Sequence, residues 1–393
     1  MGYKRLFADD ILKVIYAPHK AFKTIVENPR FIGPFVVLIL FVAAQTGFFY
    51  TIVSKSYVEQ TFPTVEQSDL WTENATLWTA NSGVIISNNH DDFINGTYYG
   101  NSSIEFTLAN GTQMWIELND FESLSCYGPD GFKNLSLRIQ LISPQLEPEN
   151  ATIYLYSLSP SNYFYYNLTE EFSNSTVDVW NNLTIPVGSG NWASSSAAVS
   201  WENITGLKLD FQWPSNSNIT LLADGIFFRG IFKTVIETGG SAYITSFVLT
   251  AFTQFIFQWL LLTGLLYVIV KGFKGNVTWR VMMVSVGFLL VTMAVQAAIN
   301  IAVYSTLPPL YYPLEVIGGV PGETEVAYQT SILESTALAS AISGYLQGAI
   351  YIWTIGLCGF ATRVQTGFGW PKSLLASAAA FLLTIIILGF ILG

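Results

Sequence analysis

The chain has 393 residues, of which 51% are hydrophobic and only 11% are charged, whereas soluble domains average roughly 25% charged residues. This composition argues against a purely soluble protein, and the formal net charge of −10 at pH 7 argues against a nucleic-acid partner, which needs a basic surface. Two His and two Cys residues are too few to build a zinc or haem site.

Residues 1–30 form a basic, amphipathic segment. Apolar residues recur at helical spacing on both sides of Pro18, and lysines occupy the opposite side. The apolar patches are Ile11, Val14 and Ile15, then Phe22, Ile25 and Val26, and the lysines are Lys13, Lys20 and Lys23. Two interpretations remain open: short helices at a cytoplasmic membrane interface, or helices packed beneath a membrane bundle.

Five apolar runs are each long enough to cross a hydrocarbon core of about 30 Å, which takes about 20 helical residues. The runs are 31–53, 244–270, 281–307, 336–360 and 372–392, and their interiors contain no charged residue and no His. No short apolar stretch with a cleavage site precedes the first run, so we expect a retained anchor rather than a signal peptide. The sequence thus predicts five transmembrane helices, with a domain at 54–240 inserted between the first helix and the other four in 241–393.

The basic residues predict the orientation in the membrane. They lie before the first run and in the connections between the second and third and the fourth and fifth runs, whereas the connection between the third and fourth runs has acids only. The basic residues are Lys4, Arg5, Lys13, Lys20, Lys23, Arg30, Lys271, Lys274, Arg280, Arg363 and Lys372, and the acids are Glu315, Glu323 and Glu325. We therefore expect a cytoplasmic N-terminus, with the inserted domain and the C-terminus outside.

Within the inserted domain, the hydrophobic period changes to two, which is typical of half-buried strands. Apolar residues alternate with polar ones over 135–141, 104–108, 114–118 and 207–211. Many short strands separated by Gly, Asn and Ser turns predict an all-β sandwich. The stretch from Trp201 to Gly230, WENITGLKLDFQWPSNSNITLLADGIFFRG, resembles the last strands of jelly-roll, galactose-binding-like modules, in which a buried strand pair ends in an Asp-Gly-apolar-x-Phe pattern.

The inserted domain is dense in acceptors for N-linked glycans. Asn-x-Ser/Thr occurs there at Asn74, Asn95, Asn101, Asn110, Asn134, Asn150, Asn167, Asn174, Asn182, Asn203 and Asn218, and elsewhere at Asn276. Such motifs also arise by chance in a β domain rich in Asn and Thr. Their concentration favours exposure to a glycosylating compartment, so we expect N-linked glycans on most of the eleven and none on Asn276.

Seven of the eleven Trp residues lie in the inserted domain, and two of its features suggest ligands. Exposed Trp could stack on sugar rings, although buried Trp in a core is the more common role; the seven are Trp71, Trp78, Trp115, Trp180, Trp192, Trp201 and Trp213. Asp91 and Asp92, with Asn88, Asn89 and His90 beside them, offer oxygen ligands for Ca²⁺, although a solvated turn explains them equally well. We expect Cys126 to be buried and inert.

Three stretches of the apolar part carry motifs at its first span, its second connection and its last two spans. APHKAFKTIVENPRFIGPF, from Ala17, has a Pro-x-x-x-Phe-x-x-Ile step and Asn-Pro before the first span. KGFKGNVTWRVMMVSVGF, from Lys271, is similar to a short cytoplasmic hairpin. YIWTIGLCGFATRVQTGFGWPKSLLASAA, from Tyr351, is similar to the end of one span and the start of the last. Together the three stretches resemble the Yip1 domain family of five-span membrane proteins. The resemblance implies a membrane-embedded organiser or adaptor that binds other membrane proteins, and it transfers no catalytic residue.

The apolar runs contain no His, Asp or Glu in their interiors to serve as a base, so we expect no enzyme activity and no ion-coupled transport. Small and amide side chains there predict helix packing, including a Gly-x-x-x-Gly step. The packing candidates are Gly344, Gly348, Gln254, Gln258 and Gln296.

The function predicted from these features is that of a non-enzymatic membrane scaffold or accessory subunit, whose β domain contacts external partners. Its expected surroundings are membrane lipids and other membrane proteins, in a larger complex or a homo-oligomer, with no cofactor besides glycans. Two alternatives remain open: a cell-surface receptor whose sandwich binds carbohydrate or Ca²⁺, and a conduit for a neutral solute or lipid lined by the Gln residues. We favour an archaeal cell surface over a eukaryotic secretory membrane as the location.

Overall fold

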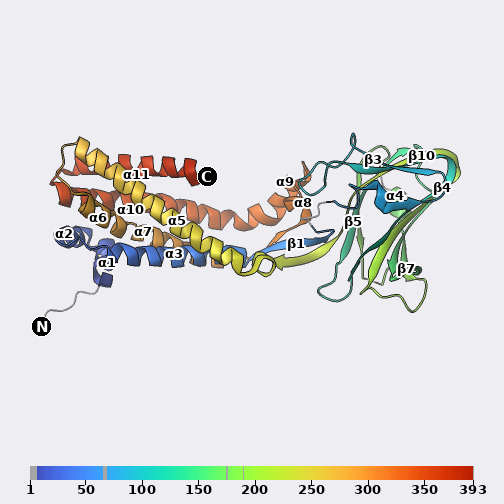
Figure 1. Ribbon diagram of the computed structural model, residues 1–393, viewed down its shortest axis with the longest axis horizontal. Helices are drawn as coiled ribbons and strands as arrows, with labels where there is room; N and C mark the ends of the chain where they lie inside the picture. Colours follow the sequence, from blue (N-terminus) through green and yellow to red (C-terminus); the bar gives the residue numbers. More distant parts are fainter. Residues whose placement is uncertain (1–6, 65–68, 174–175, 189, 393) are drawn as a thin grey trace. The chain divides into compact units, whose positions relative to one another are not determined.

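The structure, a computed structural model, describes residues 7–64, 69–173, 176–188 and 190–392. The chain divides into two compact units (Figure 1). The helical unit comprises Met1–Ser56, Thr234–Leu310 and Glu334–Gly393, and the β unit comprises Tyr57–Lys233 and Tyr311–Leu333. Lys4, Arg5 and the glycan acceptor Asn174 lie outside the described residues.

The helical unit contains long apolar helices, as the sequence predicts. Its helices are α1 (Phe7–Tyr16), α2 (Pro18–Glu27), α3 (Ile32–Val53), α5 (Val235–Gly272), α6 (Trp279–Leu289), α7 (Val291–Ser305), α10 (Glu334–Thr366) and α11 (Trp370–Leu392). Among the described residues, five helical stretches are long and apolar enough to cross a membrane: Ile32–Val53, Ala242–Gly272, Trp279–Ser305, Glu323–Thr366 and Trp370–Ile391. Insertion into a membrane and its direction stay predictions.

The third apolar run, expected as one helix over 281–307, is interrupted. α6 ends and α7 begins at Leu290, whose ψ of −2° departs from helical geometry. The Thr292 hydroxyl donates to the Leu289 carbonyl (3.2 Å) and pairs with the Thr354 hydroxyl of α10 (2.8 Å). A carbonyl near the break thus gains a partner inside the protein, which an apolar environment requires.

The N-terminal helices α1 and α2 pack against the other helices of their unit. Ile11, Val14, Phe22 and Ile25 are all buried, and they belong to the same hydrophobic cluster as residues of α5 and α6. This packing is the arrangement that the second sequence-based interpretation describes.

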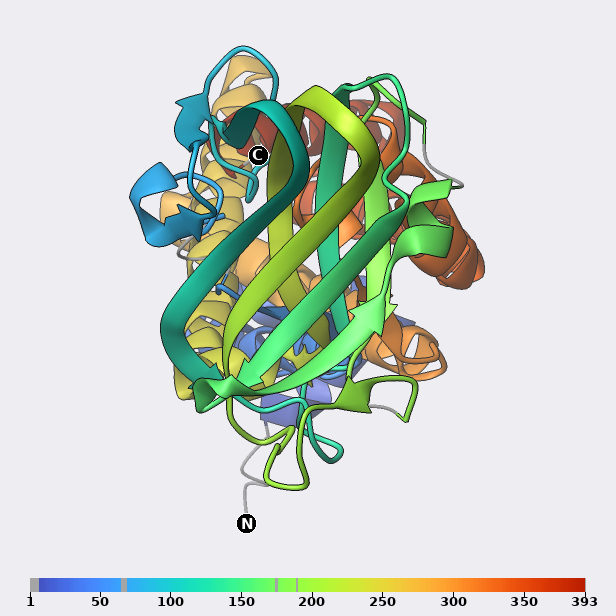
Figure 2. The same cartoon turned by 90° about the vertical axis from the view of Figure 1, so that its right-hand side faces the viewer.

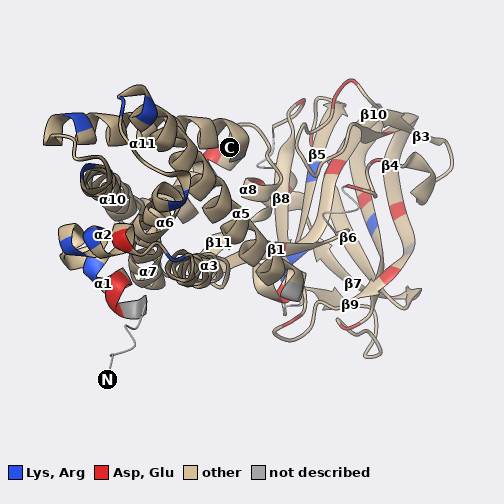
Figure 3. Ribbon diagram, turned by 60° about the vertical axis from the view of Figure 1, so that its left-hand side comes forward, with Lys and Arg blue, Asp and Glu red and all other residues tan. Residues whose placement is uncertain are grey.

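Most basic residues of the helical unit gather at the end that carries α1 and α2 (Figure 3). Lys55, which follows the other end of α3 and donates to the carbonyl of Ser305 (2.7 Å), is an exception. Arg280 donates to the carbonyl of Pro29 (3.3 Å), and Lys372 donates to the carbonyl of Phe273 (2.9 Å). The N-terminal segment and the connections α5–α6 and α10–α11 are therefore tied together at one end, which is the end that the charge distribution assigns to the cytoplasm.

The β unit is a large antiparallel sheet, as the alternating patterns predict. Its strands are β1 (Ser56–Phe62), β2 (Trp78–Ala80), β3 (Val84–Asn89), β4 (Ser103–Leu124), β5 (Asn134–Ser143), β6 (Asn150–Ser157), β7 (Ser159–Asn167), β8 (Asn181–Pro186), β9 (Ala193–Ser194), β10 (Ile204–Thr234) and β11 (Leu310–Tyr312). Short helices α4 (Thr169–Ser173), α8 (Leu314–Ile317) and α9 (Glu323–Tyr328) and a 3-10 turn (Ala75–Leu77) complete it, and a π-helical turn (Gln329–Leu333) follows α9.

The two long strands β4 and β10 contribute to both layers of the β unit (Figure 2). In the first layer, residues 206–212 of β10 lie between β4 and β6, and the layer continues through β7 to β9. In the second layer, residues 220–223 of β10 lie between β4 and β5, and the layer continues to β8. Inward side chains of both layers form one core, which includes Ile116, Leu209 and Ile153 from the first and Phe106 and Leu137 from the second.

Residues 311–333, which we expected only as a connection between two spans, belong to the β unit. β11 pairs with β1, and Leu314 and Val320 form a small cluster with Tyr99 and Phe227. Phe227 lies on the outer side of β10, because its neighbour Phe228 belongs to the main core. The segment 311–333 therefore covers part of the outer surface of the second layer.

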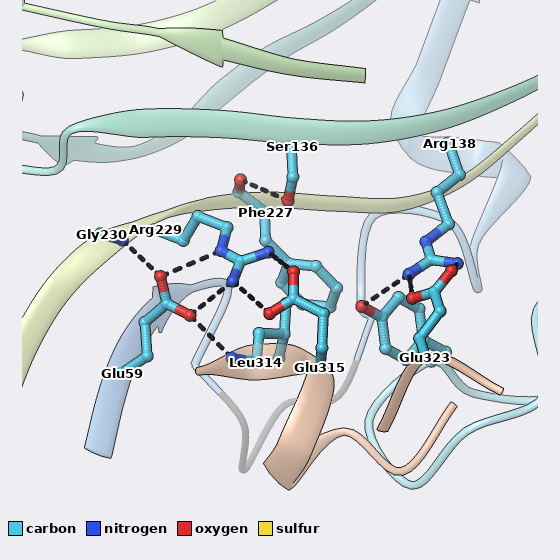
Figure 4. Close-up of polar contacts among 10 residues, drawn as sticks. Glu59, Ser136, Arg138, Phe227, Arg229, Gly230, Leu314, Glu315 and Glu323 are labelled. Carbon is cyan, nitrogen blue, oxygen red and sulfur yellow. Dashed lines mark hydrogen bonds and ion pairs between the residues drawn. The ribbon is translucent and has the colours of Figure 1, made fainter. Parts of the chain in front are cut away.

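Two arginines of the second layer bind acids of this segment (Figure 4). Arg229 donates to both oxygens of Glu59 (3.0 and 2.7 Å) and also pairs with both oxygens of Glu315, one of them at 2.7 Å. Arg138 makes a bidentate pair with Glu323 (2.9 and 2.6 Å). Burial opposes the ionisation of Glu315, but the hydrogen bonds from Arg229 outweigh it and lower the pKa of Glu315.

Candidate functional site

The outer surface of the first layer carries aromatic and charged side chains in register. Glu117 of β4 pairs with Lys208 of β10, Lys208 with Tyr154 of β6, and Tyr154 with Tyr165 of β7. The neighbours of these residues along each strand, such as Ile116, Leu209, Ile153 and Phe164, are buried in the core. Since successive side chains of a strand point to opposite faces, the four paired residues form a row across the outer surface.

Further residues extend this row on both sides. Trp115 of β4 pairs with Asp210 of β10, and Tyr163 of β7 pairs with Tyr156 of β6. We call the set Trp115, Glu117, Tyr154, Tyr163, Tyr165, Lys208 and Asp210 the aromatic face. Tyr165 is 41% exposed, and the others are half-buried.

Lys208 contacts two rings and a carboxylate on one side of the aromatic face. Its ammonium lies 4.9 Å from the centre of the Trp115 ring and 5.5 Å from that of Tyr154, within the range of cation–π attraction. The same ammonium is 3.7 Å from a carboxylate oxygen of Asp210, whose other oxygen accepts from Gln113 (2.9 Å). These contacts restrain a long side chain and place a cation beside two rings.

The tyrosines pack against one another on the other side. The Tyr154 ring centre is 5.4 Å from that of Tyr163 and 6.3 Å from that of Tyr165. Gly206 of β10 leaves room beside them, since a Cβ there would lie 2.6 Å from the Tyr156 ring. Burial raises the pKa of Tyr154, and the charge of Asp210 raises it further. Tyr154 therefore keeps its hydroxyl proton at neutral pH and can both donate and accept.

The aromatic face could therefore bind a ligand that has apolar ring faces and several hydroxyl groups. Aromatic rings supply flat apolar contact area, while Glu117 and Asp210 accept hydrogen bonds and Lys208 donates them. Sequence reasoning singled out Trp115 only as one of seven Trp, and it missed the three tyrosines. The alternation of Tyr154 and Tyr156 with Ile153 and Leu155 was the available signal.

Most of the other Trp residues have structural roles. Trp71, Trp78, Trp192, Trp201 and Trp213 pack in or against the main core, and Trp180 packs against the small cluster around Tyr99. Cys126 is buried as expected, and burial raises the pKa of its thiol to about 12. Its thiol is therefore un-ionised and unreactive at neutral pH.

No described glycan acceptor in the β unit is fully buried. Exposed acceptors are Asn95, Asn101, Asn110, Asn167, Asn182 and Asn218, and half-buried ones are Asn74, Asn134, Asn150 and Asn203. Asn276 is also exposed. The attachment of glycans stays a prediction.

The calcium candidates Asp91 and Asp92 lie in a turn that is held by hydrogen bonds within the chain. Their backbone N–H groups donate to the side chain of Asn89 (both 2.9 Å), and the Asp92 carboxylate accepts from the Trp180 indole (2.8 Å). Among the described residues, no group of three or more His, Cys, Asp or Glu side chains could hold a metal ion. Calcium binding stays a prediction without support from this geometry.

A second acidic pair lies buried in the β unit. Asp69 and Asp224 are both fully buried, and Asp224 accepts from the Thr72 hydroxyl (3.1 Å) and the Ile94 N–H (2.7 Å). Burial raises the pKa of Asp224 to about 6. Burial and the nearby charge of Asp224 raise the pKa of Asp69 as well.

This pair should make the β unit less stable as the pH rises. A carboxyl group whose pKa is higher in the folded than in the unfolded chain contributes stability below its unfolded pKa, and that contribution is lost as the pH passes the folded value. Between pH 4.5 and pH 7.5 the urea midpoint should fall in the wild type and fall less in the isosteric double variant Asp69→Asn, Asp224→Asn. Urea titrations of the full chain, followed by Trp fluorescence, measure this. Equal pH dependence in the two proteins would contradict the assignment.

The packing candidates in the helical unit fall into two groups. Gly344 and Gly348 are exposed on α10, and no heavy atom beyond the surrounding helix lies within 4 Å of where their Cβ atoms would be, so they mediate no packing between described helices. Their use between chains stays a prediction. Gln254, Gln258 and Gln296 instead line a common cavity of about 510 Å³, and they form no hydrogen bonds that join described helices.

Comparisons with known proteins give likenesses to solved structures only. No family model matches the chain, and no curated protein matches it. One similar structure, of carbohydrate-binding modules from the β-sandwich superfamily, is 14% identical over 39% of this chain, with a TM-score of 0.28, and the match spans 57% of that chain. A family 11 carbohydrate-binding module from Clostridium thermocellum, in complex with a β-1,3-1,4-mixed-linked tetrasaccharide, is 14% identical over 39% of this chain and 89% of its own, with a TM-score of 0.27. A family 30 module of a cellulosomal cellulase from the same organism is 10% identical over 40% of this chain and 92% of its own, with a TM-score of 0.28.

The Yip1 domain resemblance is wrong, because no family model matches any part of the chain. The stretches that suggested it are short and rest on a few Pro, Gly, Trp and Lys positions. Such residues recur wherever an apolar helix meets a short basic turn, so they do not identify a family.

Proposed function

We propose that the β unit is a carbohydrate-binding module, which the apolar helices anchor in a membrane. One observation carries the proposal: the row Glu117, Lys208, Tyr154 and Tyr165, flanked by Trp115, on the outer surface of an antiparallel layer. In this proposal the β unit lies outside the cell and no catalytic step is involved. The scaffold or accessory-subunit role has no comparable observation in its favour.

The physical argument concerns how a sugar is held in water. The C–H faces of a pyranose ring are apolar and stack on aromatic rings, whereas its hydroxyls need both donors and acceptors. The aromatic face supplies both within one cluster, since Lys208 lies near two rings and within 3.7 Å of Asp210. The rings are already packed against each other, so little side-chain freedom is lost on binding.

A glycan array tests the proposal. The full-length protein is applied in lipid nanodiscs, because sugar-based detergents would compete for the same face. We expect binding to at least one class of glycan and a loss of at least about tenfold in affinity for Tyr154→Ala, since truncating a central aromatic contact costs about 2 kcal/mol. Tyr127→Ala, at a loop residue that is 63% exposed, is the matched control and should bind like the wild type.

Two results would count against the proposal. The first is a folded wild-type protein that binds no glycan on the array. The second is binding that Tyr154→Ala and Asp210→Asn both leave unchanged, because a sugar on the aromatic face must contact these side chains or their neighbours.

A further inference from the structure

The cavity in the helical unit is unusual in its polarity. It lies among α3, α5, α7, α10 and α11, and six carboxamide side chains line it: Gln45, Gln254, Gln258, Gln296, Asn300 and Gln347. These residues come from four helices that the sequence predicts to lie in lipid. In such helices, polar side chains that face the interior commonly mark a pathway or a binding site.

Most of these amides lack partners within the protein. Asn300 is 6% exposed, and its side-chain oxygen is buried without a hydrogen bond. Gln258 is 8% exposed and has no partner among the described residues. Gln347, by contrast, donates to the Tyr351 hydroxyl (2.7 Å).

Unpaired amides in apolar surroundings are costly, so water or a ligand must satisfy them. The neighbouring hydroxyls of Thr292 and Thr354 are paired with each other at 2.8 Å, so they do not satisfy the amides of the cavity. Several amides that line one space can bind several hydroxyl groups at once, because each amide both donates and accepts.

The lining also excludes charged ligands. No Lys, Arg, His, Asp or Glu is among the lining residues, so a charged group would be buried without a counter-ion. Apolar side chains, including Phe41, Phe48 and Phe381, form the rest of the wall and suit an alkyl portion. The volume of about 510 Å³ is within the range of ligand pockets.

We infer that this cavity binds an uncharged polyhydroxylated group. Two sources share this chemistry: the headgroup of a neutral glycolipid and a free sugar or polyol. The inference does not depend on carbohydrate binding by the β unit, because every lining residue belongs to the helical unit.

The test uses full-length protein in nanodiscs that contain a monoglucosyl diacylglycerol with a photoreactive diazirine near its headgroup. We expect crosslinks, located by mass spectrometry, on the helices that line the cavity, and at least fivefold less capture by the near-isosteric double variant Gln258→Met, Asn300→Leu. Ala297→Leu, which fills the cavity without removing an amide, should lower capture as well. Gln365→Leu is the matched control, because Gln365 is another buried, unpaired amide of α10 that does not line the cavity.

A second arm distinguishes the two sources. Competition by free methyl glucoside indicates a soluble sugar, and capture that methyl glucoside does not reduce indicates the lipid headgroup. Three outcomes would overturn the inference: equal capture by all variants, equal labelling by photoreactive phosphatidylglycerol, and no capture in the cavity at all. The cavity would then be a space that water fills. Tyr154→Ala should not change capture, so failure of this test and failure of the proposed β-unit function are separable.

Discussion

Replacing Arg229 by methionine is expected to lower the free energy of unfolding of the β unit by about 3–5 kcal/mol. Among the residues that the structure describes, Arg229 is the only cation paired with Glu59, which is almost fully buried, and it also binds Glu315. Removing it leaves two carboxylates close together, of which that of Glu59 is buried and that of Glu315 is half-buried. The loss in free energy of unfolding is large because the two remaining charges have no counter-ion. This holds whether or not the intact cluster makes a net contribution to stability.

Urea titration of the full chain in nanodiscs, followed by Trp fluorescence, measures this effect, since seven of the eleven Trp lie in the β unit. Arg229→Lys is the matched control. Its free energy of unfolding should fall less than that of Arg229→Met, because lysine keeps the charge but not the bidentate geometry. The triple variant Arg229→Met, Glu59→Met, Glu315→Leu should regain much of the lost free energy of unfolding, because it also removes the two carboxylates that Arg229→Met leaves without a counter-ion. A change below about 1 kcal/mol in Arg229→Met would refute the account of this cluster.

Replacing the adjacent Phe228 by alanine is expected to cost a similar amount, about 3–5 kcal/mol, for a different reason. Phe228 is fully buried on the inward side of β10, and its ring centre lies about 6 Å from those of Trp71, Phe121 and Phe132. Removing the ring leaves a cavity in the centre of the main core. The effect should not depend on pH or salt, in contrast to that of Arg229→Met.

The same urea titration measures this second effect. Tyr127→Ala, at an exposed aromatic residue, is the control and should change stability by less than about 0.5 kcal/mol. A loss under 1 kcal/mol for Phe228→Ala would mean that the two layers do not enclose the close-packed core described above.

Local patterns predicted the elements well, because hydrophobic period and length depend on neighbouring residues only. The apolar runs 31–53 and 372–392 correspond closely to α3 and α11, and the alternation over 135–141 corresponds to β5. The break at Leu290 was missed, since the run around it is uniformly apolar and gives no sign of where a helix is interrupted.

Features that depend on distant residues could not be predicted. The aromatic face exists because β6 pairs with β10 in a register that sets Tyr154 beside Lys208, and sequence alone does not give that register. Glu315 reaches Arg229 from 86 positions away along the chain. Gln45 and Asn300 meet at one cavity only after four helices have packed, although the sequence had marked three of the other amides.

Oxidative footprinting of the aromatic face tests the central claim most directly. Hydroxyl radicals label exposed rings, so the oxidation rates of Tyr165, 41% exposed, and Tyr127, 63% exposed, can be compared with and without the strongest glycan from the array. If the β unit binds carbohydrate on this face, the glycan should slow the oxidation of Tyr165 and leave that of Tyr127 unchanged. An unchanged rate at Tyr165 under saturating glycan would contradict the account.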